Sequence, residues 1–226
     1  TKGNLLSVKY DSWKTTDLVN IVLSNPPFGG QEEDGIQKNF PEEFRTKETA
    51  DLFLALIIKI LKKNGRAAVV LPDGSLFGEG VKTKIKEELL SKCNLHTIVR
   101  LPNGVFNPYT GIKTNLLFFE KGKATKETWY YEMPYPEGIK NYSASRPIDI
   151  KHFDEIKKWW FDRKENEYAW KVLFKEIKTR NFNLDIKNGN TSEEEIAQSA
   201  EELISILENS FKKSIALLAE IKKDQK

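Results

Sequence analysis

The run Leu18-Val-Asn-Ile-Val-Leu23, followed at once by Ser24-Asn25-Pro26-Pro27-Phe28, decides the fold class. Its first six residues are mostly apolar and β-branched, which predicts a short buried strand. Because two consecutive prolines fix φ and lack backbone N–H groups, the strand is expected to end in a stiff turn. Open α/β sheets place their sites at the carboxyl ends of strands, so residues 24–28 are the first candidates for a functional site.

The sequence after this strand alternates between helical and strand patterns. Residues 49–63 predict a buried helix closed by the C-cap pair Asn64-Gly65, and residues 81–91 predict an amphipathic helix. Such alternation is typical of a parallel sheet with right-handed crossovers. The further expected strands are residues 66–71, 95–101, 114–120 and 128–133. The third and fourth strands are joined by a loop without a helix, so we expect that pair to be antiparallel.

Composition excludes several classes of protein. The 226 residues carry a net charge of +3, too small to argue for nucleic acid by itself. One cysteine and two histidines exclude a disulfide framework and a Cys- or His-rich metal centre, so no metal is expected. No apolar stretch reaches the roughly 18 residues of a membrane span, and no signal peptide opens the chain. These observations predict a cytoplasmic protein that does not enter a membrane.

The segment Asn25-Pro26-Pro27-Phe28 resembles the catalytic (Asn/Asp)-Pro-Pro-aromatic motif of methyltransferases that act on planar exocyclic nitrogens. The lone pair of such a nitrogen is delocalised, so the nitrogen is a poor nucleophile. The Asn25 side-chain oxygen and the Pro26 carbonyl can each accept one N–H, which localises the lone pair for attack on a sulfonium methyl group. Phe28 can stack on the extruded base. The alternative is that the four residues form only a turn after a strand.

The chain as a whole resembles the modification (M) subunit of type I restriction–modification systems, an N6-adenine DNA methyltransferase. This resemblance implies a Rossmann-like methyltransferase sheet, here its later half ending in an antiparallel hairpin, with a C-terminal helical extension. The family usually has proline at position 189, where this chain has Gly189. The matching stretches are residues 23–30, 51–54, 65–74, 101–106, 109–119 and 183–188.

The resemblance implies further site residues. Asn4 and Leu5 match the segment near the cofactor adenine, and Asp51 and Leu52 match the helix start that closes the cofactor pocket. The alternative for Leu52 is simple core packing. In the loop between the third and fourth strands, three residues are expected to face the target base or its backbone, although an ordinary hairpin loop is equally compatible. They are Thr110, Lys113 and Thr114.

The resemblance implies S-adenosylmethionine as the cofactor, without a metal. Its binding normally needs a Gly-rich turn after a first strand, with an acidic residue one strand later. Nothing before Asn25 has room for these elements, which lie upstream in this family. We therefore interpret the chain as a C-terminal fragment that is inactive by itself.

Three segments are expected. Residues 1–145 form the later half of the catalytic domain, residues 146–190 a basic and aromatic extension with a connector, and residues 191–226 an amphipathic helix. Lysines and arginines of residues 157–180 could contact DNA phosphates, but interleaved acidic residues also fit a solvated helix face. The final helix starts near Thr191 and Ser192. Its apolar stripe comprises Ile196, Ala200, Leu203, Leu207, Phe211, Ile215, Leu218 and Ile221.

The implied partners are DNA, a specificity (S) subunit held by the final helix, a second M subunit and a restriction subunit. The alternative for the helix is that it folds back on its own domain. The leading hypothesis is methyl transfer to the N6 amine of a flipped adenine, with the DNA sequence read by the S subunit. Its rivals are an rRNA or protein-glutamine methyltransferase, and a non-catalytic assembly module.

Overall fold

The computed structural model describes residues 3–189 and, within the C-terminal segment, residues 204–205, 207–208, 211–212 and 214–215. The chain divides into two units, residues 1–187 and residues 188–226, which are described separately. The elements of the first unit are β1 (Val19–Ser24), α1 (Thr49–Ile60), β2 (Leu61–Pro72), α2 (Asp73–Phe77), α3 (Val81–Lys92), β3 (Cys93–Arg100), β4 (Thr114–Lys121), β5 (Glu127–Glu132), α4 (Asp154–Phe161), β6 (Ala169–Leu173) and α5 (Phe174–Thr179), with short 3₁₀ turns between them.

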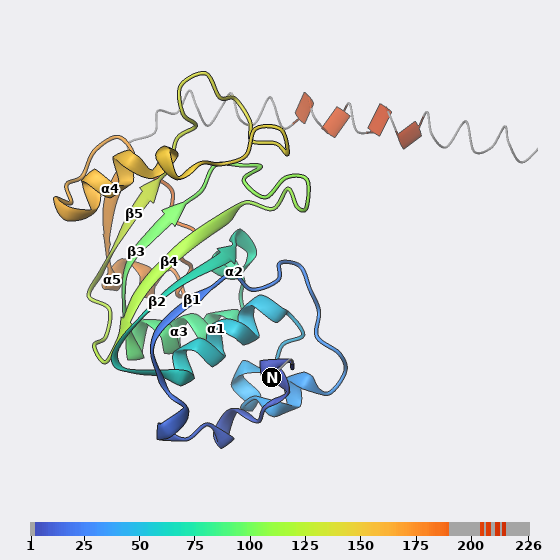
Figure 1. Ribbon diagram of the computed structural model, residues 1–226, viewed down its shortest axis with the longest axis vertical. Coiled ribbons are helices and arrows are strands. Elements are labelled where there is room, and N and C mark those ends of the chain that lie inside the picture. The colour runs from blue at the N-terminus through green and yellow to red at the C-terminus, as the bar shows by residue number, and fades with distance from the viewer. Residues whose placement is uncertain (1–2, 190–203, 206, 209–210, 213, 216–226) are drawn as a thin grey trace, which may run out of the picture. The chain divides into compact units, whose positions relative to one another are not determined.

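The first unit is built on a six-stranded mixed sheet in the order β1-β2-β4-β3-β5-β6 (Figure 1). β1 and β2 are parallel, as are β3 and β5. β4 runs antiparallel to both β2 and β3, which confirms the expected antiparallel hairpin. The carboxyl ends of β1, β2, β3 and β5 therefore lie along one edge of the sheet, and the loop between β3 and β4 leaves from that edge.

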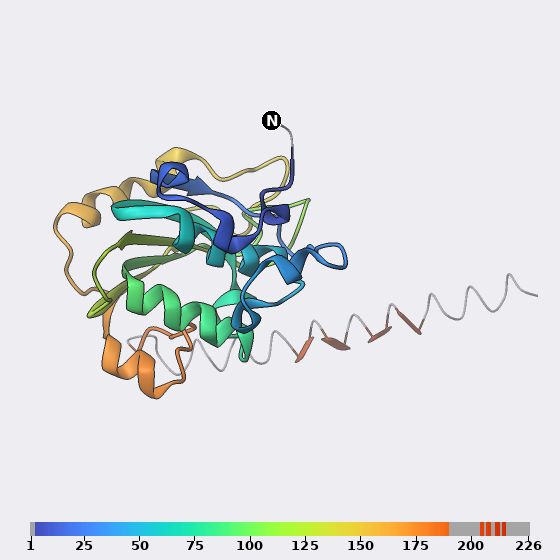
Figure 2. The same ribbon diagram turned by 90° about the horizontal axis from the view of Figure 1, so that it is seen from below.

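Each face of the sheet has its own apolar cluster, because neighbouring residues of a strand point to opposite faces. On one face, Ile98 of β3 and Tyr130 of β5 belong to the cluster that includes α1 and α3. On the other face, Val99 and Tyr131 pack with Trp159 of α4. Figure 2 shows α3 and α4 on opposite sides of the sheet.

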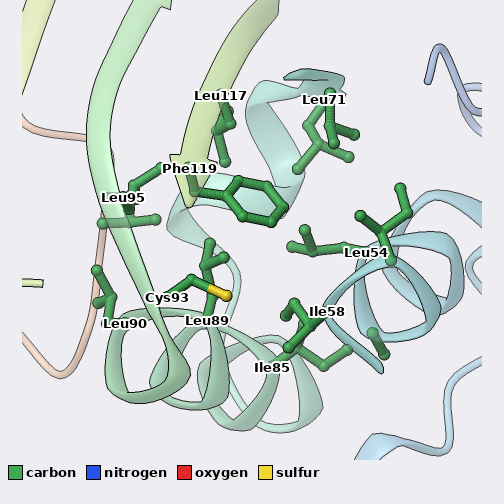
Figure 3. Packing of buried hydrophobic residues seen from close by; sticks show 14 of the residues in the cluster. Leu54, Ile58, Leu71, Ile85, Leu89, Leu90, Cys93, Leu95, Leu117 and Phe119 are labelled. Atoms are coloured by element: carbon green, nitrogen blue, oxygen red, sulfur yellow. The ribbon is translucent and has the colours of Figure 1, made fainter. Parts of the chain in front are cut away.

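The larger cluster fills the space between the sheet and two helices (Figure 3). Ile58 of α1 and Leu89 of α3 point toward Leu117 and Phe119 of β4, and none of the four side chains is more than 2% exposed. Cys93, the single cysteine, lies in the same layer and is fully buried. This packing fixes α1 and α3 under the sheet and leaves its carboxyl edge free for a site.

Three features differ from the expected elements. The first is β1, which was expected to be buried: it is the edge strand of the sheet, and Leu23 is 81% exposed. α1 ends at Ile60 rather than at residue 63, because Leu61 is fully buried and pairs with Val19 of β1. Asn64, expected as a helix cap, has φ +64° within the irregular start of β2. The third difference is β6, which lies inside the segment interpreted as an extension and pairs with β5.

The three-part division at residues 145 and 190 stays a prediction, and the structure keeps residues 146–187 in the same unit as the sheet. In the second unit the described positions between residues 204 and 215 are helical, and four apolar side chains among them are 55–66% exposed; these are Ile204, Leu207, Phe211 and Ile215. Residues 191–203 and 216–221, which carry the helix start and the rest of the predicted stripe, lie outside the described residues. Among the described residues, no helix is long and apolar enough to cross a membrane.

Candidate active site

The Asn-Pro-Pro-Phe motif stands where the sequence predicts it, directly after β1. Ser24, the last residue of β1, pairs with Val69 of β2, so the motif begins at the carboxyl edge of the sheet. Pro26 is buried beneath this edge, whereas Asn25 is exposed. The buried proline fixes the turn, and the exposed amide of Asn25 is free to meet a ligand.

The loop between β3 and β4 lies against this motif. The ring of Phe28 contacts the ring of Phe106 edge-on, with centroids 5.2 Å apart and an interplanar angle of 78°. Gly29 has φ +65°, and a Cβ at that position would lie 3.9 Å from Cδ1 of Ile112. The structure thus brings Phe28 and Gly29 together with the loop of residues 101–113, the loop in which the sequence assigned Thr110 and Lys113 to the target base.

The segment after the motif is tied to the start of α1. The carbonyl of Gly30 accepts a hydrogen bond from the Thr49 N–H at 3.1 Å, and a Cβ on Gly30 would come within 3.1 Å of the Thr49 hydroxyl. Asn4 reaches the same segment, since its side-chain Nδ2 donates to Glu32 at 2.8 Å. Asn4 and Leu5 are both exposed beside the loop that follows the motif. A cofactor role for these two residues stays a prediction.

Asp51 and Leu52 have a different setting. Leu52 is fully buried, and Asp51 is only 2% exposed. The Asp51 carboxylate accepts a hydrogen bond from the Ser75 hydroxyl at 2.7 Å and lies 2.9 Å from the Lys82 ammonium. In this structure these residues hold α1 against α2 and α3, and neither side chain presents an open surface to a cofactor. Their predicted cofactor contact is untested.

The three loop residues predicted to face the base have separate environments. The Thr110 hydroxyl accepts a hydrogen bond from the Ile112 N–H at 3.1 Å, which shapes the loop. Lys113 Nζ lies 3.3 Å from Glu132 at the end of β5. Thr114 is the first residue of β4 and is 1% exposed, so its side chain belongs to the sheet rather than to the loop surface.

A polar layer at the same edge had no role assigned from the sequence. Asn115 of β4 is fully buried and donates from Nδ2 to Asp73, directly after β2, at 2.6 Å. Arg100 of β3 is 1% exposed and lies 2.6 Å from Asp185. Asp73 and Asp185 lie in stretches that carry the family resemblance, but their contacts join distant parts of the chain. Only the three-dimensional structure reveals them.

The sheet face behind the motif is apolar and open among the described residues. Leu23 and Ile21 of the edge strand β1 are 81% and 59% exposed. A shallow hollow of about 370 Å³ lies beside them. It is lined by Leu23, Ser24, Asn25, Ala68, Val69, Val70, Leu116 and Phe118.

The basic and aromatic segment of residues 157–180 carries eight lysines and arginines, and four of them form ion pairs with acidic side chains. Arg163 stacks over Trp160 at 4.6 Å and Trp159 at 5.5 Å. A larger hollow of about 1040 Å³ lies beside α4, with acidic and basic side chains both on its rim. The ion pairs are Lys157–Asp154, Lys158–Glu155, Lys164–Asp162 and Lys171–Glu127. These pairs fit the solvated-face interpretation better than a phosphate-binding surface.

Comparison with known proteins agrees with this geometry. A family profile described as N-6 DNA Methylase matches residues 3–198. The type I restriction enzyme EcoEI methylase subunit of Escherichia coli is 62% identical over 192 residues, which cover 82% of this chain and 39% of that protein. A solved modification subunit assigned to a type I restriction enzyme from Vibrio vulnificus YJ016 is 47% identical with a TM-score of 0.79, covering 84% of this chain and 42% of its own.

A second solved structure, described under the complex assembly and conformational transition of the type I restriction–modification system, is 37% identical with a TM-score of 0.78. It matches over 92% of this chain and 49% of its own. This chain therefore spans less than half the length of each of these relatives. The expected methyltransferase sheet and the resemblance to type I modification subunits are confirmed. The chain belongs to the N-6 DNA methylase family.

Proposed function

We propose that this chain forms part of an enzyme that methylates the N6 amine of adenine in DNA, within a type I restriction–modification system. The observation that carries the proposal is the exposed Asn25 at the carboxyl edge of the sheet, in the same turn as Phe28, whose ring contacts Phe106. The family of N-6 DNA methylases supports the reaction class.

The chemistry follows from the motif. An adenine swung out of the duplex lies with its ring against Phe28, and its amine donates one N–H to the Asn25 side-chain oxygen and the other to the Pro26 carbonyl. These two hydrogen bonds draw the nitrogen toward tetrahedral geometry, so its lone pair becomes available for attack. The nitrogen loses its proton after the transfer, so the site needs no general base with a shifted pKa.

S-adenosylmethionine, when bound, supplies the electrophilic methyl group. Asn25 is exposed at the carboxyl edge of the sheet and fits a polar small molecule. Asn4 is also exposed, but its amide bonds Glu32 and the Leu6 N–H, and the buried Asp51 and Leu52 fit structural roles better. The open edge of β1 and the bare apolar face at Leu23 support a cofactor pocket completed by more protein than this chain provides. We expect residues 1–226 alone to lack micromolar affinity for the cofactor in a calorimetric titration, and tight binding would contradict this part.

The partners are proposed from the second unit. The exposed side chains of Ile204, Leu207, Phe211 and Ile215 offer an apolar helix face, which we assign to the S subunit. DNA, a second M subunit and a restriction subunit complete the complex. Phe211→Asp should weaken co-purification with the S subunit about tenfold, whereas Lys212→Asp, also on an exposed described residue, should not. Equal binding by both variants would contradict the assignment.

The single, buried free thiol of Cys93 supports a reducing, cytoplasmic setting.

A direct test of the reaction class offers labelled S-adenosylmethionine and three acceptors to the assembled complex. Label should enter DNA, as N6-methyladenine. Label in ribosomal RNA or in a release-factor glutamine would favour the alternative methyltransferases. Label in none of the three, with the S subunit still bound, would favour the non-catalytic assembly module, for which the exposed helix face is the specific observation.

A further inference from the structure

The loop that covers the catalytic motif has a defined base. It leaves β3 after Arg100 and joins β4 before Thr114, and Arg100 is the pairing partner of Asn115 in the β3–β4 ladder. The loop carries Phe106 onto Phe28. Whatever fixes Arg100 and Asn115 therefore fixes the base of this loop.

Arg100 is held by a segment 85 residues further along the chain. Its Nη1 donates to the Asp185 carboxylate at 2.6 Å and to the Ile186 carbonyl at 3.3 Å. That segment is itself anchored, because the Leu184 N–H donates to the Leu76 carbonyl at 3.0 Å and the Tyr130 hydroxyl donates to the Leu184 carbonyl at 3.1 Å. Asp185 thus presents its charge to Arg100 from a fixed backbone.

Asn115 is held from the other side. Its Nδ2 donates to Asp73 at 2.6 Å, and the Asp73 N–H donates to the Lys113 carbonyl at 3.0 Å, at the end of the loop. Arg100 Nε and Asn115 Oδ1 are both buried and have no hydrogen-bond partner among the described residues. Arg100 Nε is a donor and Asn115 Oδ1 is an acceptor. The two residues face each other in the ladder, and the Cβ atoms of such a pair lie about 5 Å apart. The two sides of the loop base are therefore chemically complementary.

We propose that Arg100 and Asp185 are positioning residues for the active site, an inference that rests on the proposed function. Asp185 orients the Arg100 guanidinium, Arg100 fixes the carboxyl end of β3, and the loop that follows sets Phe106 against Phe28. Residues 182–187 continue directly into the second unit. A partner that binds the second unit can thereby change the position of the loop through the Arg100–Asp185 ion pair.

The test uses the full-length protein in its assembled complex. Asp185→Asn removes the charge and keeps the size, Asp185→Glu restores the charge, and Asp154→Asn makes the same change in the exposed Lys157 ion pair of α4. Asp185→Asn should lower kcat about tenfold while KM for DNA changes less than about twofold, because a displaced loop misplaces the base without removing DNA contacts. Asp185→Glu should recover most of kcat, and Asp154→Asn should match the wild type.

Amide hydrogen exchange distinguishes a positioning role of the Arg100–Asp185 ion pair from a purely local structural one. In Asp185→Asn, amides of residues 101–113 should exchange faster, with those of α1 unchanged. Faster exchange confined to residues 182–188, with kcat unchanged, would overturn the proposal. If Asp185→Asn proves unstable, Arg100→Lys, which keeps the charge but loses the planar fork, should show the same loop signature. Failure of the wild-type complex to methylate DNA would instead refute the proposed function, and loop exchange would still report on the ion pair.

Discussion

The edge-on contact between Phe28 and Phe106, with centroids 5.2 Å apart, joins the Asn-Pro-Pro-Phe motif to a loop 78 residues further along the chain. Phe28 follows the exposed Asn25 in a turn fixed by the buried Pro26. An aromatic ring meant to stack on a base gains precision if a neighbouring ring holds its edge. The contact therefore restricts the orientation of the Phe28 ring and packs the loop against the motif.

Phe106→Ala is expected to lower kcat for DNA methylation about threefold to tenfold, because the lost aromatic contact releases Phe28. Single-turnover methylation by the assembled complex measures the effect. Phe161→Ala is the control, since Phe161 is 89% exposed at the end of α4. A Phe106→Ala rate equal to that of the wild type would show that the loop contact does not orient Phe28.

Because of the buried Lys86, we expect the free energy of unfolding to rise with pH above about pH 8. Its side chain is 2% exposed and donates to the carbonyls of Leu76 and Gly78, and burial lowers its pKa to about 8. Between that value and the ordinary pKa of lysine, the unfolded chain binds a proton that the folded chain does not. The free energy of unfolding therefore rises with pH over this window.

Chemical denaturation at pH 8 to 9.5 measures this slope. The wild type should gain up to about 1 kcal/mol per pH unit relative to Lys86→Met, which has no proton to lose. Lys84→Met changes an exposed lysine of the same helix and should keep the wild-type slope. Identical slopes in wild type and Lys86→Met would refute the prediction.

Because of His96, we expect the free energy of unfolding to fall in acid. Burial, with a contribution from the nearby Arg163 charge, lowers its pKa to about 4. Below about pH 6.5 the unfolded chain gains a proton that the folded chain excludes, so the free energy of unfolding falls as the pH drops toward 4. In urea titrations, the free energy of unfolding of His96→Gln should fall less steeply with pH than that of the wild type. His152→Gln, which keeps His96, should still show the fall that His96 causes. A wild-type slope in His96→Gln would rule out this source.

The local elements were predictable because each depends on nearby residues. The strand before Asn25 and the later strands carry short apolar runs that need no distant partner to be recognised, and the expected strand of residues 18–23 lies at residues 19–24. β6 was missed because Ala169–Leu173 is short and sits among charged and aromatic residues, and only its pairing with β5 makes it a strand. Likewise α1 stops early because burying Leu61 against β1 outweighs local helix propensity.

The candidate site divides in the same way. Asn25 and Phe28 were found because the motif is contiguous. Phe106 and Arg100 act through contacts that span 78 and 85 residues, to Phe28 and Asp185. Periodicity and spacing carry no signal for such pairs. Asp51 shows the converse, since its motif was recognised but its buried ion pair with Lys82 could be seen only in three dimensions.

The most direct test of the central claim is the N6-methyladenine content of DNA treated with the full-length complex carrying Asn25→Ala. Loss of one of the two acceptors for the amine should lower the methylation rate about 100-fold or more, with the S subunit and DNA still bound. Asn20→Ala, the same change at an exposed position of β1 before the motif, should methylate like the wild type. Undiminished N6-methyladenine formation by Asn25→Ala would contradict the account.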